Sequence, residues 1–312
     1  LIMKWYCLFK WKLLTTIYAV VYTFLTASNA HALEVAALIT KETEQSVQVL
    51  DFLRRHDVVV RKINVSNDNE LLPLEARIGN ADSLLIIGKE AFEYYLDKQL
   101  GIPSLVLFVK SSTFYHLTLA ASHISLVENR PDYTDKISAI YSDPSPKEQM
   151  ALVKRHYPYP AIATLLSPLN YYLEDELRQS AKELQLTLDI IKVDKDIDIN
   201  RALNTLPPKH ALVALPDHYI YNSMTLKNIV ISTYRSGRPI FGFSRTMVKA
   251  GAVASVITDL ETLSKECLEV LKRPNEAQPI RQYAQQSSIV INGAVARSLN
   301  LISLQQEDHQ TL

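Results

Sequence analysis

Short apolar runs alternate with amphipathic stretches along nearly the whole sequence, and this alternation restricts the fold more than any other feature. Runs of roughly four to eight aliphatic and β-branched residues have the length of strands buried on both faces of a sheet. The stretches between them carry apolar residues at helical spacing. Strands that alternate with helices form βαβ units, so the sequence predicts an α/β protein with mostly parallel sheets.

The predicted strands fall into two similar sets. They span residues 35–39, 58–65, 84–87 and 105–109 in the first half, and 162–166, 186–193, 211–215 and 240–243 in the second. A Gly-Ile-Pro triplet at Gly101 before one strand is matched by Gly-Arg-Pro at Gly237. A chain of 312 residues, 47% of them hydrophobic, has more hydrophobic residues than a single core normally contains. We therefore expect two Rossmann-like lobes with parallel sheets, joined by hinge strands.

The lobe boundaries follow from breaks in this pattern. Residues 111–160 contain several proline turns and predict an irregular stretch, with a first crossing between lobes near residues 142–146. The pattern then resumes with a strand over 252–258, a helix over 259–271, and a strand and short helix over 289–299. We assign residues 33–142 plus 246–285 to lobe 1 and residues 143–245 plus 286–312 to lobe 2.

The N-terminal segment has the pattern of an export signal. Three lysines precede an apolar run over residues 13–27, and the small-x-small triplet ending at Ala32 follows it. We expect a signal peptide over residues 1–32, cleaved after Ala32, which directs the protein to the periplasm. The alternative is a retained membrane anchor, although the run is shorter than the roughly 20 apolar residues of a spanning helix.

Charge and cysteine content narrow the function classes. Without the leader's three lysines the chain has 30 basic residues (33 minus 3) against 33 acidic ones, a net charge near −3. Such a balance lacks the basic excess of a nucleic-acid-binding protein. Cys267 is the one cysteine left, on a predicted apolar helix face with Leu263 and Leu271, so we expect a core thiol and no intrachain disulfide. We also expect a monomer.

Common enzyme motifs are absent from the sequence. It contains no Walker loop, no dinucleotide-binding glycine motif, no nucleophile elbow and no zincin helix. His116 and His123 are seven residues apart and suggest no metal-ligand spacing. We therefore predict no catalytic residue, no cofactor and no metal. A hydrolase whose triad is assembled from distant residues stays open, because triads are defined by geometry.

Polar residues follow the carboxyl ends of several predicted strands. Open α/β sheets bind ligands at this edge, where helix N-termini and free backbone N–H groups converge. The candidate ligand-binding residues are Gly88, Lys89, Ser111, Ser112, Ser167, Asn170, Asp217, Tyr221, Asn222, Ser223, Phe243, Ser244 and Arg245. All are expected to open onto a cleft between the lobes.

Specific roles can be suggested for four of these residues. Asp217 and Arg245 carry opposite charges that suit the amine and the carboxylate of a zwitterion. Tyr221 and Phe243 could supply aromatic walls, with core packing as the alternative. The structural alternatives for the others are capping by Asn170, Asn222 and Ser223, a tight turn at Gly88 and an ion pair at Arg245.

Five segments resemble the bacterial ABC-transporter-type substrate-binding family, in the branch related to aromatic amino-acid binders. They are residues 140–158 (IYSDPSPKEQMALVKRHYP), 211–223 (ALVALPDHYIYNS), 231–245 (ISTYRSGRPIFGFSR), 248–255 (VKAGAVAS) and 289–301 (IVINGAVARSLNL). The resemblance implies a type I periplasmic binding fold, in which two lobes joined by three hinge crossings close on a ligand. The loop at Gly88 and Lys89 departs from the Thr/Pro-rich loop that amino-acid binders of this family commonly show.

The leading hypothesis is a periplasmic solute-binding protein that closes on a small ligand, an amino acid or similar zwitterion, and delivers it to a membrane permease. A second hypothesis makes the closed protein a signal for a membrane receptor. A periplasmic hydrolase is the third hypothesis. The expected partners are therefore a small-molecule ligand and a membrane permease or receptor, and not nucleic acid.

Overall fold

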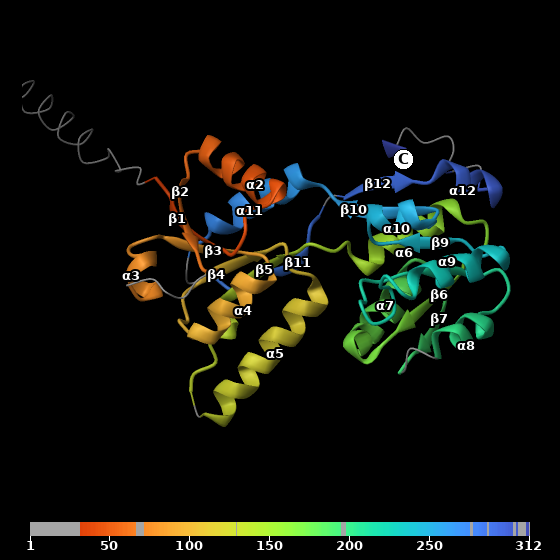
Figure 1. Ribbon diagram of the computed structural model, residues 1–312, viewed down its shortest axis with the longest axis horizontal. Coiled ribbons are helices and arrows are strands. Elements are labelled where there is room, and N and C mark those ends of the chain that lie inside the picture. The colour runs from red at the N-terminus through yellow and green to blue at the C-terminus, as the bar shows by residue number, and fades with distance from the viewer. Residues whose placement is uncertain are drawn as a thin grey trace, which may run out of the picture.

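The structure, a computed structural model, describes residues 32–66, 72–128, 130–194, 198–274, 277–285, 287–301, 304 and 310–311. The predicted leader, apart from Ala32, lies outside the described residues. The chain forms two α/β lobes side by side (Figure 1). This confirms the predicted fold class.

The first lobe is built on a parallel six-stranded sheet in the order β11-β5-β4-β3-β1-β2. Its strands are β1 (Glu34–Ile39), β2 (Val59–Asn64), β3 (Ser83–Ile87), β4 (Ser104–Leu107), β5 (Ile137–Tyr141) and β11 (Arg281–Tyr283). Its helices are α2 (Glu44–Arg55), α3 (Leu74–Ile78), α4 (Lys89–Lys98), α5 (Ser111–Val127), the 3-10 helix η1 (Thr134–Lys136) and α11 (Leu260–Leu271).

The second lobe is built on a seven-stranded sheet in the order β13-β12-β10-β9-β8-β6-β7, in which only the β10–β12 pair is antiparallel. Its strands are β6 (Ala161–Leu166), β7 (Thr187–Lys192), β8 (Ala211–Val213), β9 (Ile240–Gly242), β10 (Ala254–Thr258), β12 (Ser287–Ile291) and β13 (Gln310–Thr311). Its helices are α6 (Pro146–His156), the 3-10 helix η2 (Pro168–Leu173), α7 (Glu174–Glu183), α8 (Asp198–Thr205), α9 (Leu226–Arg235), α10 (Arg245–Ala250) and α12 (Gly293–Ser298).

Each sheet is covered by helices on both faces, which explains why inner strands such as β3, β4 and β6 are mostly apolar. In β3, Leu84 and Ile86 pack toward α4 and α5, whereas Leu85 and Ile87 point to the opposite face and pack toward α2 and α11. Helices α2 and α11 come from the two ends of the chain and lie together on this face (Figure 1). Each fully buried aliphatic side chain stabilises the fold by roughly 1.5–3 kcal/mol.

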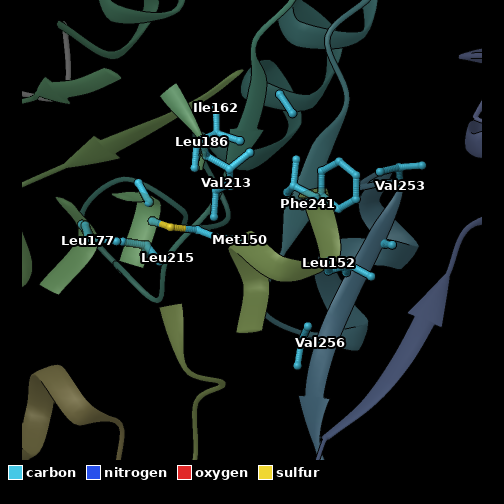
Figure 2. Packing of buried hydrophobic residues seen from close by; sticks show 14 of the residues in the cluster. Met150, Leu152, Ile162, Leu177, Leu186, Val213, Leu215, Phe241, Val253 and Val256 are labelled. Atoms are coloured by element: carbon cyan, nitrogen blue, oxygen red, sulfur yellow. The ribbon is translucent and has the colours of Figure 1, made fainter. Parts of the chain in front are cut away.

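The second lobe has the same layered construction. Figure 2 shows Ile162, Val213 and Phe241, from three neighbouring strands, packed together with Met150 and Leu152 of α6. The other face of the sheet packs against α8, α9 and α10. The two lobes therefore have separate cores, each formed on both sides of its own sheet.

The second crossing between lobes lies farther along the chain than the sequence suggested. Strand β10 pairs with β9 and β12, so residues 246–258 belong to lobe 2, not to lobe 1. The chain returns to lobe 1 at Asp259, which caps α11. The division placed the crossing too early because β10 and its preceding helix resemble any other βα unit, and only strand pairing assigns them to a sheet. The first crossing joins β5 to α6.

The stretch 111–160 is more regular than predicted. It contains the 17-residue helix α5, strand β5 and helix α6. Helix α5 has no Asp, Glu, Lys or Arg, and large apolar residues such as Leu119 and Leu126 lie on its exposed side. Without a charged face the sequence shows no clear helical period. The proline turns that follow the helix therefore led to the prediction of an irregular stretch.

Candidate ligand-binding site

A pocket of about 250 Å³ lies between the two lobes. Lobe 1 contributes the residues after β3 and β4, and lobe 2 contributes the loop after β8. All three segments follow the carboxyl ends of strands in parallel arrays, where ligand sites of such sheets form. The lining residues are Lys89, Phe108, Val109, Lys110, Ser112, Thr113, Pro216 and His218.

The lobe 1 side of the site is organised by a buried aspartate. Asp143, in the first crossing, accepts hydrogen bonds from the Ser111 amide at 2.7 Å and from the Ser111 hydroxyl at 2.6 Å. These bonds fix the start of α5 directly above the end of β5. Burial raises the pKa of the Asp143 carboxyl, and the Ser111 hydrogen bonds only partly offset this effect.

The lobe 2 side is organised in a similar way around Asp217. Its Oδ2 atom accepts from the Ser167 hydroxyl at 2.7 Å, from the Ser167 amide at 3.3 Å and from Asn170 Nδ2 at 3.2 Å. Its Oδ1 atom accepts from the amides of Tyr219 at 3.0 Å and Ile220 at 3.3 Å. A carboxylate offers about four acceptor positions, so this set leaves none for a ligand. Asp217 therefore organises its own loop, which corrects the expectation that it holds a ligand amine.

The predicted aromatic pair lies in lobe 2. The Tyr221 ring contacts the Phe243 ring edge-on at 6.0 Å between centroids. Tyr221 is buried, which raises the pKa of its phenol, and Phe243 is half-buried. Lys110 of lobe 1 places its ammonium 5.8 Å from the centroid of Phe243, so this ring faces the opposite lobe.

The remaining polar candidates lie at turns and helix starts. Asn222 Oδ1 accepts from the amides of Met224 and Thr225 and closes the turn before α9. Ser223, in the same turn, is exposed. Ser244 caps α10 by accepting from the Met247 amide at 3.3 Å. The exposed Arg245 is the first residue of that helix. The contacts of Asn222 fit its structural alternative, and the cap formed by Ser244 was not predicted.

Direct contacts between the lobes lie along α5. The His116 Nε2 atom donates a 2.6 Å hydrogen bond to the carbonyl of Leu169 in η2. The ring of Tyr115 stacks on that of Tyr172, with centroids 4.1 Å apart and planes 9° from parallel. One face of α5 therefore touches lobe 2 beside the pocket, and any opening of the lobes must break these contacts.

Several ionisable groups gather around the first crossing and the third, which joins β11 in lobe 1 to β12 in lobe 2. Tyr141 and Tyr283 contact each other edge-on at 5.2 Å. Burial raises the pKa of the Tyr141 phenol to about 12 and also raises the pKa of Tyr283. The pKa of Glu176 on α7 is raised by burial and by the charge of Asp143. Burial at these crossings thus favours neutral forms.

The structure brings part of the predicted set to the pocket. Lys89 and Ser112 line it, while Gly88 caps α4 in a left-handed conformation (φ 90°) immediately before Lys89. Ser111, Ser167, Asn170 and Asp217 support the surrounding loops instead. Sequence reasoning missed Phe108, Val109, Lys110, Thr113, Pro216 and His218. Most of these flank predicted residues, so widening each candidate loop by two or three positions would have found them.

No cluster of three or more His, Cys, Asp or Glu side chains within the described residues has the geometry of a metal site. Among the same residues, no helix combines the length and the apolarity that crossing a bilayer requires.

Comparison with known proteins places the fold. No protein-family model matches the sequence, and no curated protein matches it. Among solved structures, the ligand-free, open form of a substrate-binding protein with adhesive properties from Clostridium difficile superposes with a TM-score of 0.63 at 14% identity, covering 89% of this chain and 98% of that one. An ABC domain in complex with L-tryptophan from Streptococcus pneumoniae superposes with a TM-score of 0.54 at 16% identity, covering 89% and 99%.

A conserved domain protein from Vibrio cholerae gives the same TM-score of 0.54 and the same 16% identity, covering 90% of this chain and all of that one. Identities this low show the fold alone. The fold is that of the type I periplasmic binding proteins, as the resemblance in the sequence implied, and the neighbour with the TM-score of 0.63 is a substrate-binding protein.

Proposed function

We propose that this protein is a non-catalytic solute-binding protein that closes its two lobes on a small molecule. The observation that carries the proposal is the pocket at the facing carboxyl edges of the two sheets, which is lined from both lobes. A ligand bound there contacts both lobes at once and therefore favours the closed arrangement over the open one. The similarity of the fold to substrate-binding proteins supports the same role.

The proposal includes export and delivery. The leader pattern of residues 1–32 supports secretion to the periplasm, where the closed, ligand-loaded monomer would present its ligand to an ABC permease. Two predictions separate this role from that of a hydrolase: the ligand is recovered chemically unchanged, and membranes containing the cognate permease accumulate it only when this protein is added.

The direct test is a thermal-shift screen of a metabolite library, combined with mass spectrometry of molecules that copurify with the protein. A ligand at a hundred times its dissociation constant stabilises the folded state by about 2.7 kcal/mol. Thr113→Trp, which places an indole in the pocket, should abolish the shift. The matched control, Thr187→Trp, changes an exposed residue at the start of β7, the end of the strand away from the pocket edge. This variant should retain the thermal shift. No shift with any compound and no copurified molecule would contradict the proposal.

A further inference from the structure

The lining of the interlobe pocket indicates the charge of its ligand. We propose that the ligand is an organic anion, a carboxylate with an apolar or aromatic body and no amine, rather than a zwitterion. This inference rests on the proposed function, because it assigns a ligand class to the same pocket. Its basis is the charge of the lining residues and the state of the two nearby aspartates.

Two of the eight lining residues are lysines, one is a histidine, and none is acidic. Lys89 and Lys110 come from lobe 1 and His218 comes from lobe 2. The positive charges of the two lysines attract an anion, and the imidazole ring of His218 can donate a hydrogen bond to it from the opposite lobe. An anionic ligand that contacts both sides gains affinity specifically in the closed state, which is the condition for a ligand to drive closure.

The lysines are available for such a ligand. Lys110 is exposed and stands over the Phe243 ring at 5.8 Å, a position from which its ammonium can turn to a guest in the pocket. Lys89 makes a 3.3 Å ion pair with Glu93, but both side chains are about half exposed, and exposed pairs of this kind contribute little. A carboxylate enclosed by the pocket would compete successfully for Lys89.

A ligand amine has no acidic partner in this lining. Asp217 is 2% exposed and accepts five hydrogen bonds, two from amides of its own loop and three from Ser167 and Asn170 after β6. Asp143 is 5% exposed, and its two oxygens accept from the amide and hydroxyl of Ser111. Neither residue lines the pocket. An ammonium group enclosed here would meet the lysines instead, which disfavours free amino acids.

The rest of the pocket favours an organic anion over an inorganic one. Phe108, Val109 and Pro216 form an apolar part of the lining, and the hydroxyls of Ser112 and Thr113 stand beside it at the first turn of α5. Phe108 has a left-handed backbone (φ 59°), an unfavourable conformation for an aromatic residue and one that recurs at ligand sites. A carboxylate at the lysines and hydroxyls would place its apolar body against Phe108.

The test compares matched ligands by calorimetry on the full mature protein. Benzoate is compared with benzamide, and indole-3-acetate with tryptamine and tryptophan. In each set the carboxylate without an amine should bind at least about tenfold more tightly, which corresponds to roughly 1.4 kcal/mol. Its affinity should also fall as salt is raised, because the partly exposed lysines are screened.

Variants then locate the binding. Lys110→Gln should weaken carboxylate binding about tenfold or more, Lys110→Arg should retain most of it, and the exposed control Lys182→Gln on α7 should leave it unchanged. Preference for the amide, amine or amino acid, or carboxylate binding that survives Lys110→Gln and Lys89→Gln together, would overturn the anion inference while leaving a binding protein. Failure of every charge class, in this panel and in the metabolite screen, would overturn both.

Discussion

At its facing edge each lobe has a buried aspartate that accepts hydrogen bonds from a serine, but the aspartate of lobe 2 accepts more of them. In lobe 1 the amide and hydroxyl of Ser111 donate to Asp143, and in lobe 2 the amide and hydroxyl of Ser167 donate to Asp217. Asp217 receives three more hydrogen bonds, from Asn170 and two backbone amides. Asp143 lies in a hinge crossing and has a raised pKa, whose largest cause is burial.

This difference in hydrogen bonding should make the facing edge of lobe 2 rigid and the hinge at Asp143 adjustable. A carboxylate with five donors holds its loop in one conformation, because every alternative leaves several buried groups unsatisfied. A buried carboxyl group with few donors destabilises the fold when it is ionised and much less when it is protonated. We therefore expect lobe 2 to present a fixed surface and the Asp143 hinge to respond to pH.

The largest expected effect is the loss of the Asp217 network. Asp217→Ala removes the acceptor of five hydrogen bonds inside lobe 2 and should lower the free energy of unfolding by about 4 kcal/mol. Asp217→Asn keeps one acceptor oxygen and should cost less. Urea denaturation followed by circular dichroism measures both. A loss below about 1 kcal/mol for Asp217→Ala would show that the network is dispensable and the proposed asymmetry wrong.

The second prediction concerns pH and Asp143. Because the pKa of this carboxyl is raised in the folded state, the folded protein binds more protons than the unfolded chain between the ordinary carboxyl pKa and the raised value. The contribution of Asp143 to stability should therefore be greatest at low pH and decline as pH rises through that window. Wild type should lose stability relative to Asp143→Asn over this range, measured by urea denaturation at a series of pH values.

Glu176 must be controlled in that experiment, since its pKa is raised as well, by burial and by Asp143. The Glu176→Gln background removes this second titration, and the dependence assigned to Asp143 should persist in it. A flat difference between wild type and Asp143→Asn across the window, in both backgrounds, would contradict the prediction.

A smaller effect is expected where the lobes touch. The stacked rings of Tyr115 and Tyr172 should show a coupling energy of about 1 kcal/mol in a double-mutant cycle with alanine. Because one ring belongs to each lobe, the coupling measures how strongly the lobes are held together without ligand. The pair Phe92 and Phe114, stacked within lobe 1 at 5.3 Å, is the intralobe control. A coupling near zero for Tyr115 and Tyr172 would mean that this stacking does not hold the lobes together.

The smallest perturbation uses Cys267 as a reporter. This thiol is on the buried face of α11 in the lobe 1 core, and burial raises its pKa. A thiol reagent should therefore label it only when lobe 1 unfolds. Comparing the labelling rate with the loss of circular dichroism in urea tests whether the lobes unfold together. Rapid labelling of the native protein at neutral pH would contradict the assigned burial.

The strand pattern made most of the fold predictable, since strands such as β3 and β6 are buried on both faces and read as apolar runs. It failed at α5, whose uncharged sequence carries little amphipathic signal. The candidate loops were found because they follow strands, yet the role of each side chain was not. Asp217 and Lys110 both lie just past a strand, and nothing local shows that one is enclosed and the other exposed.

The sequence by itself determined the α/β class, the duplication of the lobes and the edge at which the pocket lies, because periodicity and strand length are local properties. Only the tertiary structure decided that β10 belongs to lobe 2, that Asp217 is occupied by donors from two loops of lobe 2 and that lysines and a histidine line the pocket. Strand pairing, burial and hydrogen-bond partners join residues distant in the chain, and one sequence carries no direct record of such contacts.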